Sequence, residues 1–229
     1  SAARQGSRLA ERGVPKQFVQ YAGQPLYWHS AASMANVARL CGLIFVFPNQ
    51  DFEACKLELA AIVQAENFAL PYLCVRGGVR RQDSVANALQ AAPLECTHIL
   101  IHDGARPFVS PQLINRVCDA LELGATAVIP GVAVVDTVKI VENNLVTSTL
   151  QRQSLRAIQT PQGFELNSLK LAHAKAATEG WNVTDDAMLL EKCGHGVQVV
   201  EGDMKSIKIT NPADLASLQP AHQEGALPR

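Results

Sequence analysis

The chain has 229 residues, of which 48% are hydrophobic and 18% charged, so it has the composition of a globular protein with a sizeable core. Its 20 Lys and Arg residues balance 21 Asp and Glu residues, which leaves no overall positive field to hold a nucleic acid or an anionic membrane. No apolar run approaches the roughly 18 to 20 residues that span a bilayer and no signal sequence is evident, so we expect a cytoplasmic protein.

Short apolar runs alternate with helical patterns along the first 130 residues. Strands are predicted at 43–47, 72–75, 98–102 and 125–130, and helices at 51–66, 82–90 and 110–123. The last of these helices opens with Ser110 and Pro111, a good N-cap followed by proline at the first helical position. Such alternation is typical of parallel strands joined by crossover helices. We therefore expect an α/β, Rossmann-like fold with a mostly parallel twisted sheet flanked by helices.

The pattern changes at 134–158, where β-branched and polar residues alternate and Asn143-Asn144 marks a hairpin turn. This segment is predicted to form a projecting β-arm. Beyond it we expect helices at 166–178 and 184–192, strands at 197–201 and 206–210, and a last helix opened by Asn211-Pro212. Residues 1–219 then form one domain, and 220–229 a tail or linker.

A doubly wound domain normally opens with an apolar strand that leads into its first loop. Ser1 stands in what is predicted to be that loop. We therefore expect an apolar strand to precede Ser1 in the natural polypeptide.

The first residues combine small side chains with four cations at every fourth position, namely Arg4, Arg8, Arg12 and Lys16. Small residues let backbone N–H groups approach an anion, and the cations neutralise phosphate charge. The same spacing also fits the basic face of a helix, although Gly6, Gly13 and Pro15 argue against one continuous helix. A phosphate-binding loop is the interpretation that we favour. It is not a Walker A loop, because no Gly-Lys-Ser/Thr follows the glycines.

Asp103 follows an apolar strand directly, at the end where open α/β sheets place their ligands. A carboxylate there is suited to Mg²⁺, which takes one or two protein carboxylates together with substrate phosphates. Arg106 lies three residues later and could reach the same substrate. The alternative is that Asp103 only caps a turn around Gly104 and Pro107.

Other signals are weaker by themselves. Gly78 and Ser84 lie in a strand-to-helix loop of a common kind, and Lys208 fits a lysine that protects an edge strand. His102 is predicted to have a structural role. The six cysteines form no C-x-x-C pair, which favours reduced thiols over a zinc site or disulfides.

Seven strings in order resemble the 2-C-methyl-D-erythritol 4-phosphate cytidylyltransferase family: "PKQF", "GGVRRQDSV", "HDGARPF", "VVDTVK", "TPQGF", "TDDA" and "VEGDMKSIKIT". The resemblance runs from residue 2 to residue 215. It implies a nucleotidyltransferase fold and an enzyme that transfers CMP from CTP to 2-C-methyl-D-erythritol 4-phosphate. The products are 4-diphosphocytidyl-2-C-methyl-D-erythritol and pyrophosphate, in non-mevalonate isoprenoid biosynthesis. It also implies Mg²⁺ as cofactor and a homodimer built by the arm.

The resemblance implies that three catalytic cations contact the triphosphate and the reacting phosphates: Arg8, Lys16 and Lys208. It assigns the cytosine and ribose pocket to four small residues, Ala2, Ala3, Gly78 and Ser84, and gives Gly6 as a further nucleotide-binding residue. Two positions depart from the family pattern. Arg4 stands where the family has glycine, and Val79 where an acidic or polar residue often follows the glycine pair. These departures put the neighbouring nucleotide contacts in question.

For the acceptor, the resemblance implies that Asp103 coordinates Mg²⁺ and that Arg106 shapes the pocket beside it. Thr137 and Arg152 would reach across the dimer to the methylerythritol phosphate. A phosphate monoester is already mostly ionised at neutral pH, since its second pKa is about 6. The nucleophile then needs no general base, which explains a site of cations and Mg²⁺ without a catalytic His or Cys.

Three alternatives remain open at this point. The first is ribitol 5-phosphate cytidylyltransferase, which performs the same chemistry. The second is a catalytically silent paralogue, suggested by Arg4, and the third is a nucleotidyltransferase for another base or sugar phosphate. The ending "EGALPR" also resembles the linker before the cyclodiphosphate synthase domain of bifunctional family members.

Overall fold

The computed structural model describes residues 18–216, and its centre is a mixed β-sheet. The strands lie in the order β11 (Val197–Glu201), β6 (Ala127–Ala133), β10 (Gln162–Glu165) and β5 (His98–Ile101), and β9 (Arg156–Ile158) pairs with the end of β6. β5 and β6 both run antiparallel to β10, and β11 runs parallel to β6. The predicted α/β fold is confirmed, with three strands of the central sheet parallel and β10 inserted between two of them in the opposite direction.

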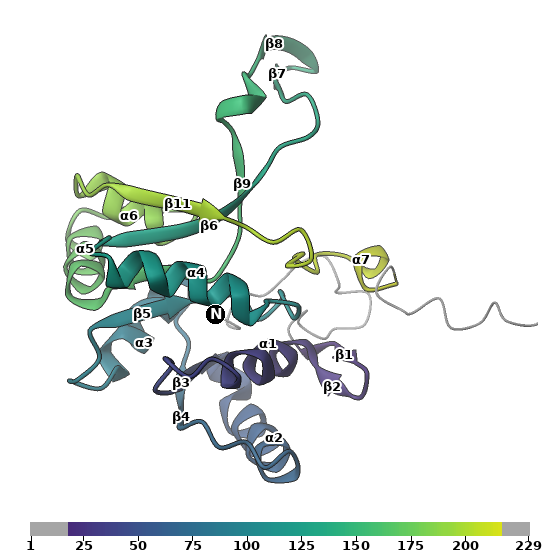
Figure 1. The fold of residues 1–229 in the computed structure, drawn as a ribbon, viewed down its shortest axis with the longest axis vertical. Helices are drawn as coiled ribbons and strands as arrows, with labels where there is room; N and C mark the ends of the chain where they lie inside the picture. The colour runs from purple at the N-terminus through teal and green to yellow at the C-terminus, as the bar shows by residue number, and fades with distance from the viewer. Residues whose placement is uncertain (1–17, 217–229) are drawn as a thin grey trace, which may run out of the picture.

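Helices cover both faces of this sheet (Figure 1). On one face α4 (Pro111–Glu122) packs against Val128 of β6, while Ile129, the next residue, packs on the other face. That second face is covered by three helices: α3 (Arg81–Ala91), α5 (Leu166–Thr178) and α6 (Ala187–Lys192). The oxygen of Ser110 accepts a hydrogen bond from Leu113 N, so the predicted N-cap of α4 is confirmed.

A second, parallel pair of strands, β3 (Leu43–Phe47) and β4 (Tyr72–Arg76), forms its own small sheet. Its aromatic core lies against two helices, α1 (Leu26–Ala35) and α2 (Phe52–Ala65). The short elements around these helices are β1 (Gln20–Tyr21), β2 (Gln24–Pro25) and η3 (Asn49–Asp51). A cavity of about 730 Å³ lies between β3 and β5. The strands and α2 match the prediction, whereas α1 was not predicted.

The arm is a hairpin of β7 (Lys139–Glu142) and β8 (Leu145–Thr149), which projects away from the sheet (Figure 1). Asn143 and Asn144 have φ angles of 51° and 64°, the left-handed values that a two-residue hairpin turn requires. The hairpin exposes four large apolar side chains: Ile140, Val141, Leu145 and Val146. The predicted arm is therefore confirmed as a projecting element.

The predicted strand at 206–210 is wrong, because this segment is an irregular loop. Polar and apolar residue types alternate in this segment, but its burial does not, since Ser206 and Ile209 are fully buried and Ile207 and Lys208 between them are both exposed. The Ser206 carbonyl accepts a hydrogen bond from the Arg106 side chain, and Ile209 N donates to Ala105 O instead of to a strand.

The remaining differences are at the ends of helices. α6 begins at Ala187, three residues later than predicted, because Asp185 Oδ1 accepts the Met188 N–H and holds a turn before the helix. The short η4 (Arg152–Ser154) ends the arm, and the last helix is α7 (Pro212–Ala216), as predicted. None of the helices within residues 18–216 is long and apolar enough to cross a membrane.

Candidate functional site

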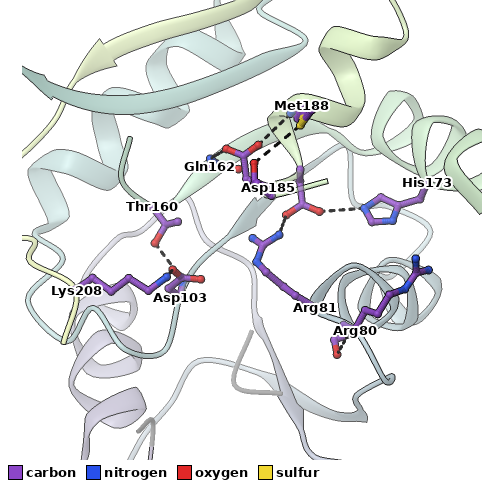
Figure 2. A network of polar contacts seen from close by, with 12 residues as sticks. Arg80, Arg81, Asp103, Thr160, Gln162, His173, Asp185, Met188 and Lys208 are labelled. Carbon is purple, nitrogen blue, oxygen red and sulfur yellow. Dashed lines mark hydrogen bonds and ion pairs between the residues drawn. The ribbon is translucent and has the colours of Figure 1, made fainter. Parts of the chain in front are cut away.

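Asp103 lies just beyond the end of β5, where it meets Lys208 from the loop that follows β11 (Figure 2). Lys208 Nζ donates to Asp103 Oδ2 at 2.5 Å, although 105 residues separate the two in sequence. The Asp103 side chain is 15% exposed and that of Lys208 is 41% exposed. Burial would raise the pKa of the Asp103 carboxyl, but positive charges, among them those of Lys208 and Arg81, hold the pKa well below its usual range. Asp103 is therefore an anion at neutral pH.

A chain of hydrogen bonds fixes the backbone next to this carboxylate. Asp103 N donates to Thr160 Oγ1 at 3.1 Å, and the same hydroxyl lies 3.0 Å from His102 Nδ1. His102 Nε2 lies 3.1 Å from Arg106 O. Burial lowers the pKa of His102 to about 4, although Asp103 opposes this, so the ring is neutral. Its Nε2–H then donates to the Arg106 carbonyl, and Nδ1 accepts from Thr160. The predicted structural role of His102 fits this geometry.

Arg106 ties the same loop to two other segments. Its Nη1 donates to Ser206 O at 2.7 Å, and its Nη2 donates to Ile158 O at 3.4 Å. Gln159 adds a second link, since its Nε2 donates to Asp203 O and its Oε1 accepts from Asp203 N. These contacts hold the loop that carries Lys208. The position of Lys208 relative to Asp103 is thus set by the backbone and not by the ion pair alone.

The loop before α3 is also closely fixed. Gly78 N donates to Ser84 Oγ at 3.0 Å, and the Ser84 hydroxyl donates to Arg80 O. A Cβ atom at Gly78 would lie 2.4 Å from the Cβ atom of Asp83, so only glycine fits there. The structure therefore brings Gly78 and Ser84 together in this loop. Val79 is fully exposed, and its side chain makes no packing contact in this loop.

Arg81 links this loop to the far side of the site. Its Nη1 lies 2.6 Å from Asp186 Oδ2, and the other oxygen of Asp186 lies 3.1 Å from His173 Nε2. In Figure 2, Arg81 from α3 and His173 from α5 point toward the same region. Burial would raise the pKa of Asp186, but the hydrogen bond from His173 and the charge of Arg81 lower it. This buried cluster anchors the first residue of α3.

The remaining predicted site residues do not join this cluster within one chain. Thr137 and Arg152 are exposed on the arm segment, and Arg152 Nη1 donates to Val135 O at 2.6 Å. The five predicted residues of the N-terminal loop lie outside the described residues: Ala2, Ala3, Gly6, Arg8 and Lys16.

Asp103 is also the residue that fits a divalent cation. Within residues 18–216 no group of three or more His, Cys, Asp or Glu side chains could hold a metal by itself. Lys208 contacts Oδ2 of Asp103, and no donor from the described part of the chain contacts Oδ1. A single carboxylate with an oxygen to spare suits Mg²⁺, which keeps several waters and is completed by substrate phosphates.

Sequence reasoning missed four residues that shape this site. Gln159 and Thr160 position the Asp103 and Lys208 loops, and Arg81 and Asp186 anchor the loop before α3. All four lie in or beside strings that carry the resemblance, "TPQGF", "TDDA" and "GGVRRQDSV". The strings mark the segments, but their letters do not reveal which side chains bind which backbone groups.

The chain is similar to known proteins along its whole length. The family model "IspD: 2-C-methyl-D-erythritol 4-phosphate cytidylyltransferase" matches residues 1–221. The chain is 47% identical over 229 residues to the bifunctional enzyme IspD/IspF of Nitratidesulfovibrio vulgaris, covering 99% of this chain but 58% of that enzyme. It is also 45% identical over 160 residues to a 2-C-methyl-D-erythritol 4-phosphate cytidylyltransferase of Nostoc punctiforme, covering 69% of this chain and 70% of that protein.

The fold agrees with these sequence similarities. The crystal structure of a 4-diphosphocytidyl-2C-methyl-D-erythritol synthase from Anaerococcus prevotii superposes with a TM-score of 0.79 at 28% identity. The match covers 88% of this chain and 90% of that one. The chain spans little more than half the length of the bifunctional relatives that it matches.

Proposed function

Because the chain belongs to the 2-C-methyl-D-erythritol 4-phosphate cytidylyltransferase family, we propose that it transfers CMP from CTP to 2-C-methyl-D-erythritol 4-phosphate and releases pyrophosphate. The observation that carries this proposal is the Asp103–Lys208 pair at the end of β5. It combines a carboxylate suited to a cation with a lysine that is exposed enough to reach a phosphate. The described residues around this pair are positioned by partly buried hydrogen bonds, as a site for two polyanions requires.

In this proposal the 4-phosphate of the acceptor attacks the α-phosphorus of CTP. A new P–O bond forms, the bond to the β-phosphate oxygen breaks, and pyrophosphate leaves with the electron pair. Lys208, together with Arg8 and Lys16, offsets the negative charge that builds up as the two phosphates approach. No general base is needed, since the attacking oxygen is already ionised.

Asp103 would hold Mg²⁺ together with phosphate oxygens of CTP. When bound, the ion supplies charge neutralisation and fixes the orientation of the triphosphate. Gly78 and Ser84, which are locked together before α3, would form one wall of the cytosine and ribose pocket.

The arm completes the proposal. Its hairpin exposes Leu145 at 71% and Val146 at 60%, more apolar surface than an isolated projecting hairpin can readily leave in water. We propose that two copies pair through their arms and that Thr137 and Arg152 of one copy contact the acceptor bound to the other. The exposure of both residues leaves them accessible to such a ligand.

The natural polypeptide is also proposed to be bifunctional, with a cyclodiphosphate synthase domain after residue 229. The relatives named as bifunctional enzymes, of which this chain covers 54 to 58%, support this. Mass spectrometry of the native protein tests it: a species well above the mass of 229 residues is expected, and a product that ends near Arg229 would contradict it.

The activity is tested by pyrophosphate release with CTP and Mg²⁺, comparing methylerythritol phosphate with ribitol 5-phosphate as acceptor. We expect release with the former alone. Release with ribitol 5-phosphate alone would assign the other acceptor. If neither supports release although CTP binds, the chain is a silent paralogue, and Arg4→Gly becomes the variant to measure.

A further inference from the structure

Lys208 stands between two residues that are fastened to other parts of the molecule. Before it, Ser206 is fully buried, and its carbonyl accepts hydrogen bonds from the side chains of Arg106 and Gln159. After it, Ile209 is fully buried, and its N–H donates to Ala105 O at 2.8 Å. The place of the Lys208 backbone therefore depends on how firmly these flanking residues are held.

The turn at 201–206, which leads from β11 to Lys208, is bound by the side chain of Gln159. This residue is only 6% exposed. Its Oε1 accepts from Asp203 N at 2.9 Å, and its Nε2 donates to Asp203 O at 2.8 Å and to Ser206 O at 3.3 Å. A Cβ atom at Gly202 would lie 2.6 Å from Gln159 Oε1, so glycine leaves room for this amide. One side chain thus binds the turn as a neighbouring strand would.

Helix α4 holds the same turn from another side. Arg116 Nε donates to Glu201 O at 3.0 Å, and its Nη2 donates to Gly202 O at 3.2 Å. At the start of the helix, Ser110 Oγ donates to Asp203 Oδ2 at 2.9 Å. The turn is therefore fixed both by the helix and by Gln159.

Gln159 is itself fixed to the central sheet. Its N–H donates to Pro130 O of β6 at 2.8 Å. The next residue, Thr160, accepts the hydrogen bond from Asp103 N at 3.1 Å (Figure 2). Two successive residues thus hold the two loops that carry the ion pair. The spacing between the Asp103 and Lys208 backbones is set by this one short segment.

The ion pair is not sufficient to keep Lys208 in place during the proposed reaction. The Lys208 side chain is 41% exposed, and a lysine side chain is long and flexible. When the substrates bind, Asp103 would hold Mg²⁺ and Lys208 would contact the reacting phosphates. The direct contact between them is then exchanged for contacts with ligands, and the backbone must keep both groups in place.

We propose that Gln159 is a positioning residue that sets the place of Lys208 relative to Asp103, with Arg116 supporting the same turn from α4. Gln159 touches neither substrate in this proposal, and it acts on the reaction through Lys208. The inference rests on the proposed function, because the role of Lys208 in turnover does.

A double-mutant cycle tests this. Gln159→Met keeps the length of the side chain but has no amide to bind the turn. Turnover should fall by about tenfold, since a small displacement of a catalytic group is costly. KM for CTP and for the acceptor should stay within about threefold, because Lys208 acts as charge builds up in the transition state. In the Lys208→Ala background, Gln159→Met should cause no further fall in turnover.

The matched control is Gln198→Met, an exposed position on β11 that should have normal turnover in both backgrounds. Normal turnover of Gln159→Met would overturn the proposal. An equal loss in the two backgrounds would also overturn it, since Gln159 would then act independently of Lys208. So would a rise in either KM with unchanged turnover, which is the signature of a substrate contact.

Hydrogen exchange gives a readout that does not depend on catalysis, so it separates failure of this inference from failure of the proposed activity. In Gln159→Met the amides of Asp203, Ser206 and Ile209 should exchange about tenfold faster or more, and those of α5 should not change. The Gln198→Met control should match the parent chain. Faster exchange at Asp203 alone would contradict the proposal, because the residues on either side of Lys208 would still be held.

If Gln159→Met does not fold, Arg116→Met provides the second variant, since Arg116 is only partly buried. It removes two hydrogen bonds to the turn. Turnover should fall by about threefold in the parent chain and not at all in the Lys208→Ala background. Unchanged turnover, or an equal fall in both backgrounds, would contradict the proposal.

Discussion

The loop at Asp103 and the projecting arm both carry residues assigned to the same reaction, yet they are built in opposite ways. The Asp103 loop is held by a set of partly buried hydrogen bonds from Thr160, Arg106 and His102. The arm is a two-stranded hairpin whose residues are all exposed. The loop has its geometry fixed within one chain. The arm needs a second surface to have a defined position, because a two-stranded hairpin is marginally stable by itself.

This difference indicates that the two regions have different roles in the proposed reaction. Charge must be placed accurately where the phosphates react, and buried donors and acceptors achieve this without reorganisation. In the proposed dimer, the arm of the partner copy takes part in recognition of the acceptor through Thr137 and Arg152. Changes in the loop should therefore affect both catalysis and stability, and changes in the arm should affect assembly.

The largest effect is expected at Lys208. Lys208→Ala should lower turnover by about 10²–10³-fold, because it removes a cation at the reacting phosphates. Its melting temperature should fall only modestly, since the Lys208 side chain is 41% exposed and the charge of Arg81 still stabilises the Asp103 carboxylate. Turnover is measured by pyrophosphate release and stability by thermal unfolding. Lys205→Ala, an exposed lysine of the same loop, is the matched control and should be close to normal. Equal effects of the two variants would remove Lys208 from its catalytic role.

The second largest effect is expected in the pH dependence of the unfolding free energy. The pKa of His102 is about 4 in the folded protein and about 6.5 when unfolded, so the unfolded chain binds more protons between these values. This contribution to stability is complete above about pH 6.5 and is lost as the pH falls toward 4. Between pH 7 and pH 5 the unfolding free energy should fall by roughly 2 kcal/mol from this residue.

Urea titrations at several pH values measure this fall. His102→Gln carries no titrating ring, so its unfolding free energy should depend less on pH across the same range. The Asp103 and Asp186 carboxyls, whose pKa values lie below the usual range, affect stability at lower pH. If the unfolding free energy of His102→Gln still fell by the full amount between pH 7 and pH 5, His102 would not be the residue responsible for the pH dependence.

A smaller loss of stability and turnover is expected from substitution of Thr160. Thr160→Val keeps the shape of the side chain but leaves Asp103 N and His102 Nδ1 without the hydroxyl. The unfolding free energy should fall by about 1–2 kcal/mol, and turnover should fall with it as the Asp103 loop loosens. Thr160→Ser should restore both values. Thr178→Val, at an exposed helix end, serves as the control and should stay within about 0.5 kcal/mol.

The sequence predicted most of the fold because many helices and strands can be recognised from their own residues. β3 and β5 are apolar runs, and the arm turn is an Asn pair. β10 was missed because its four residues contain one large apolar side chain, Phe164. It is a strand because β5 and β6 both pair with it. The loop at 206–210 was taken for a strand because polar and apolar residues alternate along it, whereas its backbone bonds to segments distant in the sequence.

The candidate site was less accessible to local reasoning. Asp103 could be singled out by its place after a strand, but its pairing with Lys208 spans 105 residues and was not predicted, since the resemblance implied only that both residues lie near the substrate phosphates. Gln159 and Thr160 act by binding backbone groups of other loops, and no local pattern marks such a role. Long-range hydrogen bonds are set by the assembled fold, so they become visible only there.

Substitutions in the arm are expected to have the smallest effect on the stability of the single chain. They therefore give the clearest contrast with substitutions in the Asp103 loop. Leu145→Asp combined with Val146→Asp should change the unfolding free energy of the monomer by no more than about 0.5 kcal/mol, since both side chains are exposed. Sedimentation should nevertheless show loss of the dimer. KM for methylerythritol phosphate should then rise by about tenfold or more, while CTP binding stays normal. Because the proposal places the CTP contacts within one chain and those of Thr137 and Arg152 across the dimer, only binding of the acceptor should be affected. A monomeric variant with unchanged KM would show that each chain works alone.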